Sequence, residues 1–324
     1  MDTIAETAPD TDLSRDASPD TFFRVAEIWV PEGGRLVHAG GDYGNSPGFA
    51  EASVAESFAE GEGLPGKAWQ RRRPVVLGAF DGSYFRRTAA ASEAGLTSAV
   101  AVPVFAQDTL KAVLVVFCGD GAGRRGAIEL WQDIEERLTL VDGHYGDASA
   151  FEAASRHITF GHGQGLPGAV WAADTPILMR DIARSGAFLR SGQAAEAGFR
   201  TGLGLPIPTP GEERFVLTLL SASNTPIARR FEIWDARPER VGATREAQLI
   251  DGTCEREGAL WPQQNPPVAP PMARAWKGPV GQVLGTGLPH VRRDRGGLPA
   301  DYSSMVALPI YRGDDLAHVV AWYL

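Results

Sequence analysis

Residues 163–171, GQGLPGAVW, contain the stretch that decides how this chain is organised, because related sequences occur twice more. They occur as GEGLPGKAW at 61–69 and, more weakly, as GPVGQVL at 278–284. In each copy a proline follows the last residue of the motif at the same distance, at Pro74, Pro176 and Pro289. A pattern that recurs in this way is the signature of repeated structural units. The chain is therefore predicted to contain three copies of one unit.

Two further motifs keep the same order around the glycine-rich stretch. A Glu-aliphatic-Trp segment precedes it, at 27–29, 129–131 and 232–234. An aliphatic-Pro-aliphatic segment follows it, at 102–104, 205–207 and 308–310. The distance from Trp to the first proline is the same in copies one and two and longer in copy three. We place the extra residues of copy three in the proline-rich segment 261–271, which favours neither helix nor central strand.

Within one copy the pattern predicts a β-rich unit with helices on one side. The Glu-aliphatic-Trp segment begins a pair of strands, and the glycine-rich stretch begins a short helix that ends before the proline. Segments 83–93 and 188–197 are predicted to be helices. The apolar runs 99–105 and 111–117 are predicted to pair as a hairpin.

Charge and composition limit the partners of the chain. A net charge of −9 and a pI near 5.2 provide no basic surface, so nucleic acid and membranes are not expected partners. The apolar runs are strand-sized, and residues 1–21 are acidic and predicted to be disordered. We expect a cytoplasmic protein.

These motifs resemble those of a GAF domain, which has a glycine-rich helix start, a G-x-P-V strand, an Ala-Gly turn and a V-P-V hairpin in this order. Copy two fits best, through 163–171, Thr175 to Leu178, 196–201 and 205–207. The resemblance implies an α+β fold of three tandem GAF-like units, each a central antiparallel β-sheet with flanking helices. We assign the repeats to 22–125, 126–228 and 229–324, the third degenerate because it lacks the Ala-Gly turn.

The resemblance also implies a small-molecule pocket between sheet and helix-side loops. In repeat two the candidate lining is Phe160, His162, Trp171, Asp181, Phe188 and Phe199. In repeat one it is Phe58, Trp69, Tyr84, Phe85 and Leu96. The alternative for these aromatic residues is that they pack a small core, as buried aromatics commonly do.

The sequence favours binding over catalysis. The two cysteines, Cys118 and Cys254, have no counterparts in the other copies, and no metal or cofactor is expected. We expect a non-enzymatic sensory or regulatory protein that binds an unidentified small molecule, a protein partner or a second copy of itself. The alternatives are an assembly scaffold without ligand and, less favoured, an enzyme on a GAF-like scaffold.

Overall fold

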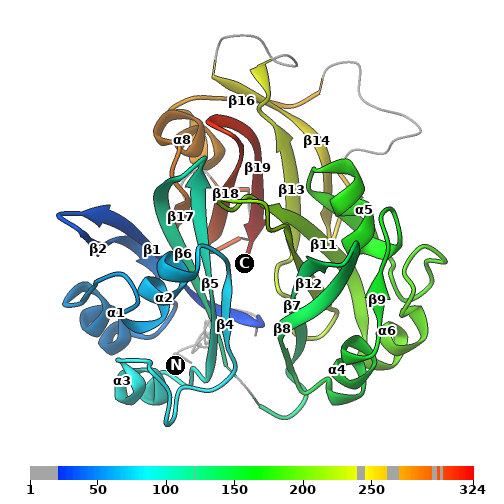
Figure 1. The fold of residues 1–324 in the computed structure, drawn as a ribbon, viewed down its shortest axis with the longest axis horizontal. Helices are drawn as coiled ribbons and strands as arrows, with labels where there is room; N and C mark the ends of the chain where they lie inside the picture. Colours follow the sequence, from blue (N-terminus) through cyan, green and yellow to red (C-terminus); the bar gives the residue numbers. More distant parts are fainter. Residues whose placement is uncertain (1–20, 120, 239–244, 261–269, 294–297, 300–301) are drawn as a thin grey trace, which may run out of the picture.

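A computed structural model of the chain describes residues 21–119, 121–238, 245–260, 270–293, 298–299 and 302–324. The predicted disordered tail therefore lies outside the described residues except for Thr21, and so does most of the predicted insertion 261–271. The described chain forms three antiparallel β-sheets with short helices, so the predicted α+β architecture is confirmed (Figure 1). No helix among the described residues has the length and apolar character that a membrane span requires.

The first sheet has the strand order β3-β2-β1-β6-β5-β4. Its strands are β1 (Phe23–Glu32), β2 (Arg35–Asp42), β3 (Ser57–Phe58), β4 (Val75–Leu77), β5 (Ser98–Ala106) and β6 (Thr109–Cys118). Its helices are α1 (Pro47–Val54), α2 (Gly63–Arg71) and α3 (Thr88–Glu93).

The second sheet repeats this order, β9-β8-β7-β12-β11-β10 when read from the equivalent edge. Its strands are β7 (Arg125–Ile134), β8 (Arg137–Gly146), β9 (Thr159–Phe160), β10 (Ile177–Arg180), β11 (Phe199–Ile207) and β12 (Phe215–Ala222). Its helices are α4 (Ser149–Arg156), α5 (Gly165–Ala173) and α6 (Ser191–Ala197).

The third sheet has the order β15-β14-β13-β19-β18-β17, and β16 pairs with β14. Its strands are β13 (Arg230–Asp235), β14 (Glu246–Cys254), β15 (Gly258–Ala259), β16 (Met272–Arg274), β17 (His290–Arg292), β18 (Met305–Arg312) and β19 (Asp315–Tyr323). The helix α8 (Gly278–Thr286) packs against it.

Two predicted helices are shorter than the sequence suggested. The segments 83–93 and 188–197 contain α3 and α6, but these helices begin only at Thr88 and Ser191. The residues before α3 form a turn, in which the Ser83 hydroxyl donates to the Phe80 carbonyl at 2.7 Å and accepts from the Phe85 amide at 3.1 Å. Such local side-chain bonds compete with helix formation.

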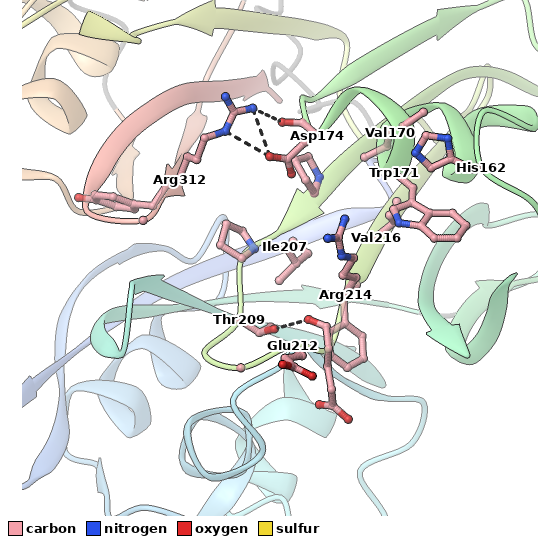
Figure 2. A pocket seen from close by; sticks show the side chains of 18 residues that line it. His162, Val170, Trp171, Asp174, Ile207, Thr209, Glu212, Arg214, Val216 and Arg312 are labelled. Atoms are coloured by element: carbon pink, nitrogen blue, oxygen red, sulfur yellow. Dashed lines mark hydrogen bonds and ion pairs between the residues drawn. The ribbon is translucent and has the colours of Figure 1, made fainter. Parts of the chain in front are cut away.

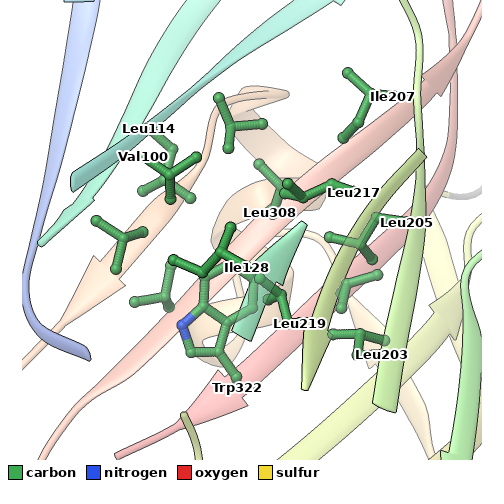
Figure 3. Close-up of a cluster of buried hydrophobic side chains, with 14 of the residues drawn as sticks. Val100, Leu114, Ile128, Leu203, Leu205, Ile207, Leu217, Leu219, Leu308 and Trp322 are labelled. Carbon is green, nitrogen blue, oxygen red and sulfur yellow. The ribbon is translucent and has the colours of Figure 1, made fainter. Parts of the chain in front are cut away.

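The three sheets surround one central core. Along β5, Val100, Val102 and Val104 point to this core, while Ala99 and Ala101 point to the helices. The central core also includes Leu205 and Leu308 from the other two sheets (Figure 3). Each sheet has a separate core on its helix side. Every sheet is therefore buried on both faces.

Edge strands close the arrangement into a ring. The edge strand β4 of the first sheet contacts β8 of the second, β10 contacts β14 of the third, and β17 contacts β2 of the first. The β5–β6 and β18–β19 turns also meet, because the Gln107 amide donates to the Gly313 carbonyl at 3.0 Å. We call these contacts between neighbouring sheets the seams. A structural change in one sheet can reach the next sheet through them.

Candidate functional site

The pocket residues predicted in repeat one lie together, in the helix-side core of the first sheet. Phe58, Phe85 and Leu96 are buried there, and Trp69 and Tyr84 are partly buried at its edge. The structure thus brings all five side chains into one cluster, which is packed with side chains of the chain itself.

An ion pair occupies the centre of this cluster. Arg87, just before α3, donates from Nη2 to Oε2 of Glu27 at 2.9 Å and also hydrogen-bonds Ser53. Both charged side chains are buried, and the guanidinium lies 4.7 Å from the ring centroid of Phe49. The Trp29 indole donates to the same Glu27 carboxylate at 3.1 Å. The arginine therefore fills the place between sheet and helices where a ligand was expected.

The second sheet has the same arrangement. Arg190 donates from Nη2 to Oε2 of Glu129 at 2.9 Å, and the Thr218 hydroxyl donates to the same oxygen at 2.9 Å. Burial raises the pKa of the Glu129 carboxyl, but the Arg190 guanidinium and the hydrogen bonds outweigh burial and hold that pKa below its ordinary value. The predicted residues Phe160 and Phe188 lie against Arg190, at 5.5 and 5.3 Å from its guanidinium.

The remaining predicted residues of repeat two separate into three places. Phe199 is buried against Phe151, with ring centroids 4.9 Å apart. Asp181 lies at the surface, 3.6 Å from the Arg200 guanidinium. His162 and Trp171 contact each other edge to face at 5.1 Å, and both line an open cavity.

This cavity has a volume of about 700 Å³ and lies at the seam between the second and third sheets. Its walls are the end of α5, the β11–β12 hairpin and the β18–β19 turn (Figure 2). The lining residues that carry polar groups are His162, Trp171, Asp174, Thr209, Glu212, Glu213, Arg214, Tyr311 and Arg312. A volume of this size is typical of small-molecule sites.

Most charged groups around the cavity are held by protein partners. Arg312 of the third sheet donates from Nε to the Asp174 carboxylate at 3.2 Å, and so joins the two sheets across the top of the cavity. Glu213 accepts from the Gln132 side chain at 3.2 Å. Arg214 differs, because its guanidinium has no hydrogen bond or ion pair to any described residue, and it points into the cavity between Ile207 and Trp171 (Figure 2).

The sequence indicated His162 and Trp171 but not the other cavity residues. Arg214 lies in a turn, and Arg312 belongs to the next repeat, 138 residues from its partner Asp174. The buried arginines Arg87 and Arg190 were also missed. A signal for them exists, because they follow Pro74 and Pro176 at nearly equal distances in the two repeats.

Groups for metal or thiol chemistry are not gathered at this site. Among the described residues no cluster of three or more His, Cys, Asp or Glu side chains could hold a metal ion. Cys118 and Cys254 form no disulfide, are buried and do not line the cavity. The Thr209 hydroxyl, which does line the cavity, donates to the Glu213 carbonyl at 2.9 Å.

Comparison with known proteins gives one family match. Residues 12–141 match the GAF domain family, a range that covers the first sheet and continues into β7 and β8 of the second. No curated protein matches the chain.

Solved structures with similarity to the chain include both an enzyme and GAF domains of other proteins. The free methionine-R-sulfoxide reductase from Neisseria meningitidis in complex with its substrate is 18% identical, with a TM-score of 0.24, over 30% of this chain and 52% of that chain. The GAF domain of a phosphoenolpyruvate-protein phosphotransferase from Coxiella burnetii is 17% identical, with a TM-score of 0.25, over 30% and 56%. The A. aeolicus nlh2 GAF domain in an inactive state is 24% identical, with a TM-score of 0.25, over 31% and 59%. The match thus spans little more than half of each of these structures.

Proposed function

We propose that the chain is a non-enzymatic regulatory protein of three GAF-like units, and that its ligand site is the cavity at the seam between the second and third units. Three sheets of one strand order support the three-unit description. The observation that carries the ligand proposal is the cavity of about 700 Å³ with converging polar groups beside Trp171.

The helix-side pockets of repeats one and two are less suited to a ligand. Their centres are filled by the Glu27–Arg87 and Glu129–Arg190 pairs, whose side chains are at most 3% exposed. A ligand would have to displace a buried arginine and leave a carboxylate without its partner, at a cost of several kcal/mol. Of the residues predicted for repeat two, His162 and Trp171 therefore remain our ligand-binding candidates.

The position of the cavity between two sheets suggests how ligand binding could change the structure of the protein. A ligand held between α5 and the β18–β19 turn would contact the second and third sheets together. The same turn contacts the first sheet through Gln107. If the three sheets can pack in more than one way, the ligand would stabilise the packing that it binds most tightly. The size of this effect would equal the difference in its binding free energy between the two packings.

The non-enzymatic part of the proposal rests on the cavity lining. A nucleophile needs an adjacent base that is itself held in place. The Thr209 hydroxyl donates to a backbone carbonyl, and none of the described residues that line the cavity is a cysteine or serine.

An assembly scaffold without ligand is the second candidate. It is favoured by the dense aromatic packing of the helix-side cores, which leaves Trp29, Trp131, Phe58 and Phe160 almost fully buried. In this case the cavity would hold only water.

Native mass spectrometry of protein purified from its own host, combined with a thermal-shift screen of small molecules, tests the proposal. We expect a bound small molecule, or a rise in melting temperature, that Trp171→Ala abolishes. Trp276→Ala is the matched control, because Trp276 is 61% exposed and does not line the cavity. A protein that carries no small molecule and gives no shift, but purifies as a discrete oligomer, would instead establish the scaffold.

A further inference from the structure

We infer that the seam cavity binds a planar aromatic carboxylate, with the carboxylate on Arg214 and the ring against Trp171. This inference rests on the proposed function and adds the chemical class of the ligand. It begins from the one arginine in the cavity lining whose charge no described side chain balances.

Arg214 is placed to receive an anion. It is exposed and immediately precedes β12, and its guanidinium points toward the cavity between Ile207 and Trp171 (Figure 2). A guanidinium presents two parallel N–H donors that match a carboxylate, and it stays charged at all physiological pH values. The hydrogen bonds of Arg214 are therefore available to a ligand.

The nearby carboxylates do not compete for Arg214. Asp174 is held by Arg312, which donates to both its side chain and its main-chain carbonyl at 3.2 and 3.1 Å. Glu213 accepts from Gln132 outside the cavity centre. Glu212 lies at the opposite end of the cavity from Trp171 (Figure 2). Arg214 is consequently the arginine of the lining that no described carboxylate pairs with.

Trp171 provides the surface for a ring. It is half-buried and is fixed by edge-to-face contact with His162 at 5.1 Å. The buried side chains of Val170, Ile207 and Val216 also line the cavity close to it. Aromatic ligands gain from offset or edge contacts with such a side chain beyond the burial of their area.

The cavity also places both features around one space that a single ligand could occupy. Trp171 and Arg214 both line this one cavity of about 700 Å³. A carboxylate attached directly to a fused aromatic ring offers a charge for Arg214 and a ring for Trp171. A small aliphatic carboxylate such as acetate has no ring for Trp171.

The test is isothermal titration calorimetry of the full chain with three probes: 2-naphthoate, acetate and 2-naphthylmethylammonium. These carry ring and negative charge, negative charge alone, and ring with positive charge. We expect 2-naphthoate to bind most tightly. Arg214→Gln should weaken its binding on the order of ten- to a hundredfold, because hydrogen bonds to a charged group are lost. Trp171→Ala should weaken it on the order of tenfold.

Arg184→Gln is the matched control, because this arginine belongs to the same unit, has a 79% exposed side chain and does not line the cavity. It should leave the affinity for 2-naphthoate unchanged. Melting temperatures near that of the unaltered protein would show that each variant is folded.

Each other result overturns the inference at a different level. Tighter binding of the ammonium probe would reverse the ligand class while the cavity remained a binding site. Equal binding of acetate and 2-naphthoate would remove the role of Trp171, and unchanged binding by Arg214→Gln would remove that of Arg214. Absence of binding by all three probes at millimolar concentration would refute the ligand class alone, and the native mass spectra and thermal-shift screen would still decide whether the cavity is a ligand site.

Discussion

The glutamate of the Glu-aliphatic-Trp motif explains why this motif occurs in every repeat. Its carboxylate accepts the indole N–H of the tryptophan two residues later, at 3.1 Å in the first unit, 3.3 Å in the second and 2.9 Å in the third. The sequence predicted a strand here, which is correct, but not the arginine that balances the charge. Arg87 lies 60 residues after Glu27, and only the folded chain brings the two together.

At the residue scale, we predict that Arg190→Met destabilises the protein by about 3–5 kcal/mol, because it leaves the buried Glu129 carboxylate without its counter-charge. The double variant Glu129→Leu with Arg190→Met should regain a large part of this loss. Urea unfolding followed by circular dichroism measures both values.

The control for this pair is Arg156→Met. Arg156 pairs with Glu152 on the surface of α4, and its side chain is 61% exposed. The change should cost under about 0.5 kcal/mol. If Arg190→Met cost no more than Arg156→Met, the buried pair would not be an essential part of the unit.

At the element scale, the glycine-rich stretch decides where each helix begins. The amide of Gly163 donates to the Gly168 carbonyl at 2.8 Å, and the amides of Gly61 and Trp276 make the equivalent bonds in the other units. A Cβ on Gly168 would lie 2.2 Å from the Gly161 carbonyl oxygen, which is too close for any side chain. The motif therefore recurs because the backbone passes close to itself at this turn.

We predict that Gly168→Ala costs more than about 3 kcal/mol, since the opposing atoms are backbone and cannot move aside. Gly192→Ala, in α6, should instead stabilise the protein by about 0.5–1 kcal/mol, because a Cβ there meets nothing within 4 Å and alanine favours a helix. Thermal unfolding of both variants checks the opposite signs. A small effect of Gly168→Ala would show that the turn can relax.

The sequence predicted where the strands and helices lie better than it predicted which elements pack against each other. The apolar run of β5 is buried on both faces, a pattern that indicates cover on both sides of a sheet. It does not say what provides that cover. On one face the cover is α2, which is local in sequence, but on the other it is the second and third sheets. The seam cavity arises from this second contact, so Arg214 and Arg312 could not be predicted from their own repeats.

At the scale of the whole molecule, the shared core makes the three sheets dependent on one another. Residues of all three, such as Val100, Leu205 and Leu308, are no more than 1% exposed within it. Separation of any sheet would expose this face to water, at about 25 cal/mol for each Å² of apolar surface. We therefore expect a destabilising change at the contact between two sheets to lower the stability of all three sheets together.

His318 on β19 provides a way to test this dependence with pH. It is 1% exposed, and neither ring nitrogen has a hydrogen-bond partner among the described residues. Burial lowers the pKa of His318 to about 4, with Asp235 and Asp174 opposing the shift and Arg237 and Arg312 adding to it. Because this pKa lies below that of an unfolded histidine, the unfolded chain binds more protons between the two values. Stability contributed by neutral His318 is thus present at neutral pH and is lost as pH falls.

We predict that His318 alone removes roughly 2 kcal/mol of stability between about pH 7 and pH 5. His318→Leu should abolish that part of the pH dependence, whereas His157→Leu, at an exposed position, should retain it. Urea unfolding at the two pH values, followed by tryptophan fluorescence and by circular dichroism, measures the loss. Because the sheets share one core, both probes should report a single coincident transition. An equal acid loss in the His318→Leu variant would show that other groups cause it, and transitions that separate would show that the sheets unfold independently.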